Sequence, residues 1–101
     1  LRQLRIEKFF VYWGQDIFPN VTPLECGRMY RVDFSKDFIG REALLEQKKA
    51  GIHKRFVQLL VQNHDLDSDP WPQGGELIYR YGAPVGRTTS AAYGYTLGCQ
   101  V

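Results

Sequence analysis

The sequence predicts an α+β fold in which a helical first half leads into the start of an antiparallel β-barrel of Greek-key or jelly-roll type. Strong helix formers gather before Ile52, whereas apolar and β-branched segments separated by turn residues follow it. We therefore divide the chain into residues 1–52 and an incomplete barrel domain over residues 53–101. The helical pattern at Leu1 and the strand-like pattern at Val101 lead us to expect a fragment of a larger protein, truncated within the barrel.

The first expected helix covers residues 1–13. Its apolar side chains recur at i, i+3, i+4 and i+7, the spacing of one helix face: Ile6, Phe9, Phe10 and Trp13. Gly14 is a suitable C-terminal stop. The pattern indicates a packed helix.

Two more helices are expected before residue 52. One begins at Thr22, an N-cap with Glu25 three residues after it, and is cut short by Gly27. The other covers residues 41–50, where acidic residues come early and lysines late, as the helix dipole favours, and Gly51 ends it.

Four segments have the pattern of strands. Residues 29–34 alternate with period two, and residues 56–62, 76–81 and 85–95 are rich in apolar or β-branched side chains. Tyr81-Gly82-Ala83-Pro84 supplies a turn, so the last two strands are expected to form a hairpin.

Charge and cysteine usage exclude several classes of protein. Formal net charge is only +2, with both signs interspersed, which gives no case for nucleic-acid binding. Cys26 and Cys99 lie far apart and lack metal-ligand spacing, so we expect reduced thiols in an intracellular or organellar compartment. No apolar run reaches the roughly eighteen residues that a membrane span needs.

The loop over residues 64–75 superficially resembles a calcium loop. Acidic residues occupy positions 1, 3, 5 and 12 of the calcium-loop count: Asp65, Asp67, Asp69 and Glu76. The sixth position, which needs glycine, is Pro70. We therefore predict a solvated acidic loop and no metal site. A structural barrel whose loop binds calcium is the weakest alternative.

No residue has the context of a catalytic group. His53 and His64 belong to no nucleophile or zinc motif, and the hydroxyl run at residues 88–90 has no GxSxG elbow around it. The hydroxyl run is instead interpreted as strand hydrogen bonding. We predict no catalytic residue in this chain.

Arg5 is the one candidate binding residue that the pattern singles out. It shares a helix face with Arg2, and a guanidinium on a packed helix needs an anionic or carbonyl partner. That partner is either an ion-paired group of a neighbouring domain or an anionic or heteroaromatic ligand. The bare pattern favours the neighbouring domain.

Five segments, in order along the chain, resemble the glycine-cleavage aminomethyltransferase family. They are residues 4–7 (LRIE), 12–17 (YWGQDI), 22–25 (TPLE), 37–44 (DFIGREAL) and 85–90 (VGRTTS). Residues 88–95 further resemble the folate-linked mitochondrial branch of that family, which includes dimethylglycine and sarcosine dehydrogenases. The phosphatase-regulating members of that branch are the most similar at three places: Cys26, the Phe9-Phe10 pair and the loop over residues 64–75, which contains Trp71.

The resemblance implies that residues 1–52 end the folate-binding region and its connecting helices. It implies a non-catalytic regulatory subunit of the mitochondrial matrix whose partner is the catalytic subunit of pyruvate dehydrogenase phosphatase. Arg5 would contact folate, with Glu7 in a supporting role. This fragment would need no cofactor, and the longer parent could hold tetrahydrofolate or FAD. The alternative is an aminomethyltransferase or an FAD- and tetrahydrofolate-dependent dimethylglycine or sarcosine dehydrogenase.

Overall fold

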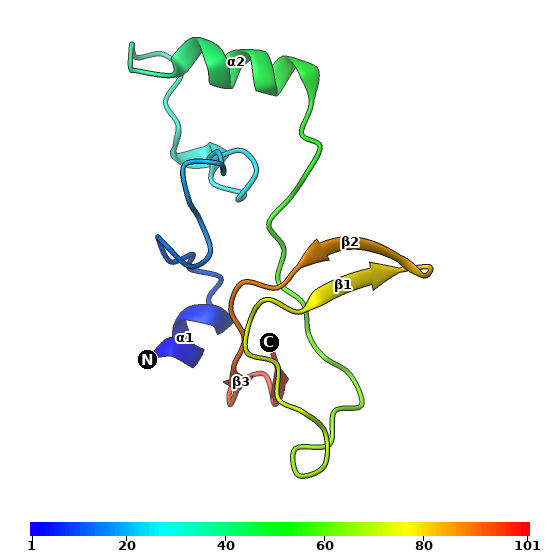
Figure 1. Ribbon diagram of the computed structural model, residues 1–101. Coiled ribbons are helices and arrows are strands. Elements are labelled where there is room, and N and C mark those ends of the chain that lie inside the picture. The colour runs from blue at the N-terminus through cyan, green and yellow to red at the C-terminus, as the bar shows by residue number, and fades with distance from the viewer. The chain divides into compact units, whose positions relative to one another are not determined.

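A computed structural model describes residues 1–101 (Figure 1). In chain order its elements are α1 (Arg2–Glu7), the 3-10 helix η1 (Met29–Arg31), α2 (Arg41–Ala50), β1 (Leu77–Arg80), β2 (Ala83–Arg87), β3 (Tyr93–Gly94) and β4 (Cys99–Gln100). They fall into two compact units: unit 1 combines residues 1–16 with residues 58–101, and unit 2 is residues 17–57. These units are defined by which residues pack together in the structure. The division at residue 52, which concerns domain ancestry, stays a prediction.

In unit 1, helix α1 ends at Glu7, so the predicted helix through residue 13 is wrong beyond that point. Phe9 has a φ of +58° and occupies the left-handed position that usually follows a helix end. Its N–H donates to Ile6 O at 2.9 Å, and the Phe10 N–H donates to Arg5 O at 3.0 Å. This is the hydrogen-bond pattern of a Schellman motif, which ends the helix although the apolar spacing continues.

Two antiparallel strand pairs complete unit 1. The hairpin of β1 and β2 is confirmed, and its loop residues Tyr81 and Gly82 both have positive φ, as two-residue hairpin loops require. In the second pair, Tyr93 of β3 lies opposite Gln100 of β4, and α1 packs against β3. The antiparallel arrangement is thus confirmed, but the two sheets are not joined into a closed barrel. The Greek-key order stays a prediction.

Two predicted strands of this region are wrong in extent. Residues 56–62 form no strand, and their backbone bonds to distant segments are isolated: the Phe56 N–H donates to Glu25 O at 2.8 Å and the Val61 N–H to Gln100 O at 2.9 Å. The predicted strand over residues 85–95 is interrupted after Arg87, because the hydroxyl groups that follow bind carboxylates elsewhere in unit 1.

Two features of unit 2 follow their local signals, α2 and the capping box at Thr22. Helix α2 is confirmed at Arg41–Ala50, with Gly51 at its C-cap. At Thr22 the capping box forms: the Glu25 N–H donates to Thr22 Oγ1 at 3.2 Å, and the Thr22 N–H donates to Glu25 Oε1 at 2.9 Å. The box closes a turn and not a full helix.

The strand predicted for residues 29–34 is also wrong. Residues 29–31 form η1, with Met29 and Tyr30 exposed. A period-two pattern stabilises a strand only against a neighbouring strand, and unit 2 contains none.

The helices of this chain are too short and too polar to span a bilayer.

Candidate functional site

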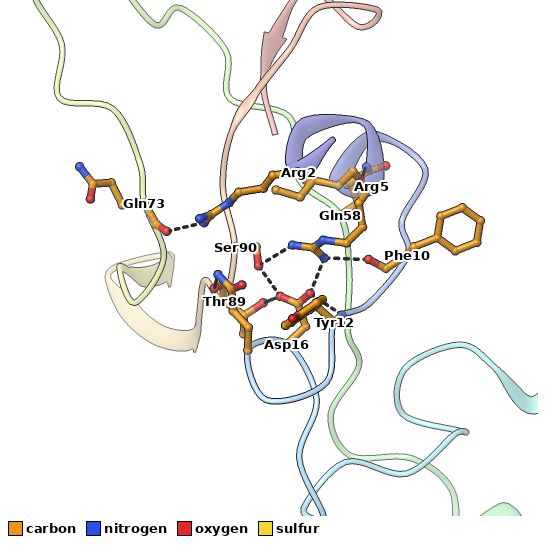
Figure 2. Close-up of polar contacts among 11 residues, drawn as sticks. Arg2, Arg5, Phe10, Tyr12, Asp16, Gln58, Gln73, Thr89 and Ser90 are labelled. Atoms are coloured by element: carbon orange, nitrogen blue, oxygen red, sulfur yellow. Dashed lines mark hydrogen bonds and ion pairs between the residues drawn. The ribbon is translucent and has the colours of Figure 1, made fainter.

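The polar centre of unit 1 is the Asp16 cluster, formed by Arg5, Tyr12, Asp16, Thr89 and Ser90 (Figure 2). Asp16 is only 5% exposed. Its Oδ1 accepts hydrogen bonds from the Thr89 and Ser90 hydroxyls, both at 2.6 Å. Its Oδ2 accepts from Arg5 Nη1 at 2.6 Å and from the Tyr12 backbone N–H at 2.8 Å. A carboxylate offers about four acceptor positions, so this one is fully occupied.

Arg5 is held from several sides. Besides Asp16, its guanidinium donates to Phe10 O at 2.8 Å and to Ser90 Oγ at 3.2 Å, and it lies 5.7 Å from the Tyr12 ring centroid. Its side chain is 17% exposed. The ion-pair partner therefore lies within this chain, which corrects the interpretation that a neighbouring domain supplies it.

The hydrogen bonds decide the charge of Asp16. Burial raises the pKa of the Asp16 carboxyl, but the bonds from Ser90, Thr89, the Tyr12 N–H and Arg5 together outweigh it and hold the pKa below its ordinary value of 3.8. Asp16 is thus charged at neutral pH. With every acceptor position filled, it organises its neighbours and has no free position to take a proton from a substrate.

Sequence reasoning missed Asp16 and misread the hydroxyl run. The sequence interpretation assigns these hydroxyls to strand hydrogen bonding, but those of Thr89 and Ser90 bind Asp16 and that of Thr88 binds Glu76. The residues that meet are 73 and 74 positions apart along the chain. Asp16 and the hydroxyl run both lie in the segments that carry the family resemblance, which was the available signal.

Glu7 holds a different part of unit 1. Its Oε2 accepts the backbone N–H groups of Thr96 and Leu97, each at 3.1 Å, and so fixes the turn between β3 and β4. Its Oε1 is buried without a hydrogen-bond partner. A Cβ on Gly94 would lie 3.0 Å from Glu7 Cγ and 2.9 Å from Val101 Cγ2, so the close approach of Glu7 requires glycine there. The supporting role toward folate stays a prediction.

Two carboxylates of the acidic loop accept hydrogen bonds from within the loop, and one of these bonds runs from the Asp65 N–H to Asp69 Oδ2 at 2.8 Å. Asp65 Oδ1 accepts the N–H groups of Asp67 and Ser68 at 2.9 and 3.3 Å. Burial is negligible there, and these bonds lower the pKa of the Asp65 carboxyl. No group of three or more His, Cys, Asp or Glu side chains is placed to hold a metal ion. Cys26 and Cys99 are both unpaired thiols.

Residues 54–101 match the family described as the glycine cleavage T-protein C-terminal barrel domain. The chain is 57% identical over 99 residues to the mitochondrial pyruvate dehydrogenase phosphatase regulatory subunit of Mus musculus, an alignment covering 96% of this chain and 11% of that protein. It is 41% identical to the mitochondrial dimethylglycine dehydrogenase of Mus musculus, with the same coverage. It is 31% identical over 100 residues to an aminomethyltransferase of Listeria monocytogenes serotype 4a (strain HCC23), covering 97% of this chain and 26% of that protein.

The resemblance seen in the sequence is thereby confirmed, although the chain spans only about a tenth to a quarter of the length of these relatives. Residues 54–101 match the glycine cleavage T-protein C-terminal barrel domain, and the chain as a whole is similar to the phosphatase regulatory subunit, dimethylglycine dehydrogenase and aminomethyltransferase.

Proposed function

We propose that this chain is part of a non-catalytic regulatory subunit of the mitochondrial matrix that binds the catalytic subunit of pyruvate dehydrogenase phosphatase and restrains it. The observation that carries the proposal is the difference in identity, 57% to the regulatory subunit against 41% to dimethylglycine dehydrogenase. Both alignments cover 96% of the chain, so the difference does not come from alignment length. Both relatives are named as mitochondrial, which supports the location.

The Asp16 cluster supports a binding and positioning role. It joins the residues after α1 to the Thr89-Ser90 segment through a charge whose acceptor positions are all occupied. Such a network gives unit 1 a fixed shape, as a protein-binding module needs. This structural role does not require a catalytic group.

The test uses the full-length parent protein and has two arms. Visible absorbance is followed while dimethylglycine or sarcosine is added, because substrate oxidation bleaches a bound flavin. Phosphatase activity of the catalytic subunit is then measured with and without the parent. The proposal expects no bleaching and a lowered phosphatase activity. Bleaching would establish the dehydrogenase alternative, and unchanged phosphatase activity would contradict the regulatory role.

We also propose that Arg5 and Glu7 would hold tetrahydrofolate if the parent binds it. Three of the five guanidinium N–H groups of Arg5 are used, by Phe10, Asp16 and Ser90, which leaves two donors on a partly exposed side chain. The unpartnered Oε1 of Glu7 is a matching acceptor. Since Asp16 already neutralises Arg5, the arginine would contribute hydrogen bonds and not net charge.

Arg5→Lys tests this role, because lysine keeps the charge beside Asp16 but loses the planar fork of donors. We expect about a tenfold rise in the Kd for tetrahydrofolate, the loss of roughly one hydrogen bond to a charged group, measured by calorimetry on the full-length parent. Arg2→Lys is the matched control, since Arg2 is exposed and donates only to Gln73 O. Equal affinity in Arg5→Lys and wild type would remove Arg5 from the folate site.

A further inference from the structure

We propose that a cleft beside β3 and β4 binds a small, neutral, planar molecule that presents a hydrogen-bond donor and acceptor side by side, as the edge of a lactam or carboxamide does. The cleft has a volume of about 490 Å³ and lies wholly in unit 1. Its lining includes Leu60, His64, Leu66, Tyr93, Cys99 and Gln100. Small-molecule sites typically have volumes of roughly 300–1,000 Å³.

Gln100 is the strongest reason to expect a ligand. It is 1% exposed, and both its Nε2 and its Oε1 are buried without a hydrogen-bond partner. Its backbone is fixed, because it pairs with Tyr93 across the strands and its carbonyl accepts the Val61 N–H at 2.9 Å. A buried amide without partners is unfavourable and rare in folded proteins. A ligand that supplied both partners would relieve this cost.

The shape of the amide sets the chemistry of the partner. A glutamine side chain offers one acceptor oxygen beside one donor nitrogen, so its best complement is a planar edge with the donor and acceptor in the opposite order. Glutamine pairs with nucleobase edges in this two-bond manner. Because the amide atoms are covered, the Gln100 side chain must turn toward the cleft as the ligand enters.

His64 offers a second unpartnered polar group in the lining of the cleft. Its Nε2 lies 3.0 Å from Pro70 O, and a carbonyl oxygen can only accept, so Nε2 carries a proton and, in the neutral ring, Nδ1 is an acceptor. That Nδ1 is buried and also lacks a partner. The edge-on contact with the Trp71 ring, 6.4 Å between centroids, helps to hold the imidazole in place. A second N–H on the ligand would satisfy it.

The remaining lining indicates a ligand without net charge. The cleft is lined by no Asp, Glu, Lys or Arg, and Leu60, Leu66 and Tyr93 give it apolar and aromatic surface. An ion would lose its hydration here without gaining an opposite charge. A planar ring could instead pack on Tyr93 while its polar edge reaches Gln100.

The test uses the full-length parent and two matched probes, 2-pyridone and 1-methyl-2-pyridone. They differ in one methyl group, which removes the lactam N–H donor. Titration calorimetry should give a Kd for 2-pyridone at least about tenfold lower than for the methylated probe, the effect of one hydrogen bond to a buried group. Equal affinities, or binding of neither probe, would overturn the proposal.

Two changes of the same kind locate the binding. Gln100→Leu should abolish the preference for 2-pyridone, whereas Gln62→Leu, an exposed glutamine of the same lining, should keep it. A preference that survives Gln100→Leu would contradict the assignment. If Gln100→Leu does not fold, the wild-type protein still tests the assignment through Cys99 of the lining. 2-Pyridone should slow the reaction of Cys99 with N-ethylmaleimide severalfold, and 1-methyl-2-pyridone at the same concentration should slow it much less. No protection of Cys99 would place the ligand elsewhere.

Discussion

The contacts within unit 1 and those within unit 2 differ in how far apart the joined residues lie along the chain. In unit 1 the Asp16 cluster joins residues that are 73 to 85 positions apart in the chain. In unit 2 the capping box and the end of α2 use hydrogen bonds between residues three or four positions apart. The stability of unit 1 therefore depends strongly on one buried charge, whereas that of unit 2 is spread over smaller terms, many of them local and the longer ones no more than 34 positions apart.

Among the substitutions considered, Asp16→Ala is expected to destabilise its unit the most. It leaves the Arg5 guanidinium partly buried without its counter-charge, and it removes the acceptor of the Thr89 and Ser90 hydroxyls and of the Tyr12 N–H. Breaking a buried ion pair on one side costs about 3–5 kcal/mol. Hydrogen exchange on the full-length parent should show the opening free energy of peptides in residues 88–101 falling by that amount, with little change in residues 41–50.

Asp33→Ala is the matched control for this change. Asp33 binds only its neighbours Ser35 and Lys36, and it is exposed. We expect its removal to leave exchange in unit 1 unaltered. Similar exchange in Asp16→Ala and Asp33→Ala would show that the buried charge is not what organises unit 1.

This contrast also explains which features the sequence could predict. Helix α2 was predictable to its last residue, since the glycine at its C-terminal end and the placement of its charges act within one or two turns. The hairpin was predictable for the same reason, because Tyr81-Gly82 determines its loop. The Asp16 cluster was not, because no local rule couples Asp16 to hydroxyls 73 and 74 residues away.

The end of α1 shows the limit of periodicity. The apolar spacing from Ile6 to Trp13 fits a helix, yet the chain leaves the helix at Glu7. At that point the chain forms the Schellman hydrogen bonds, and Arg5 donates to Phe10 O. Both arrangements accompany the ion pair between Arg5 and Asp16. Tertiary contacts thus override the local pattern where the site is built.

The next largest effect is expected for Gly51→Ala in unit 2. Gly51 has φ of 94° and ψ of 163°, a backbone region that only glycine adopts readily, so alanine should raise the free energy of the folded unit by about 1–3 kcal/mol. Space is not the cause, because an added Cβ meets nothing within 4 Å. Gly86→Ala is the control, since its φ lies outside the left-handed region and its nearest contact is Ile78 Cδ1 at 3.8 Å. Hydrogen exchange of residues 41–52 should speed up only in Gly51→Ala.

A smaller effect is expected for Thr22→Ala. The Thr22 hydroxyl accepts the Glu25 N–H and donates to Gln47 Oε1 at 2.7 Å, so alanine removes the cap and the contact with α2. Loss of such a cap costs about 1 kcal/mol. Peptides in residues 22–28 should exchange about fivefold faster, as a loss of that size implies, and Thr22→Ser, which retains the hydroxyl, should restore the slow rate. Fast exchange in Thr22→Ser would mean that the methyl group and not the hydroxyl stabilises the turn.

The smallest effect concerns Glu76, at the open end of the β1–β2 hairpin. Hydrogen bonds from the Gln73 N–H, the Thr88 hydroxyl and the Gly74 N–H lower the pKa of the Glu76 carboxyl from 4.5 to about 2. Because the folded pKa is depressed, its stabilising effect is complete above the unfolded value and declines as the pH falls from 4.5 toward 2.

Glu76 is exposed, so solvent screening should keep its contribution below about 1 kcal/mol. Exchange of residues 73–88, corrected for intrinsic rates, should differ between wild type and Glu76→Gln near neutral pH, and the difference should shrink as the pH approaches about 3. The exposed Glu42→Gln of α2 should match wild type in this segment throughout. A difference that is constant with pH would mean that Glu76 acts through shape alone. A difference that follows the pH would show that unit 1 also uses a carboxylate charge at its surface, where neighbouring N–H groups take the place of burial.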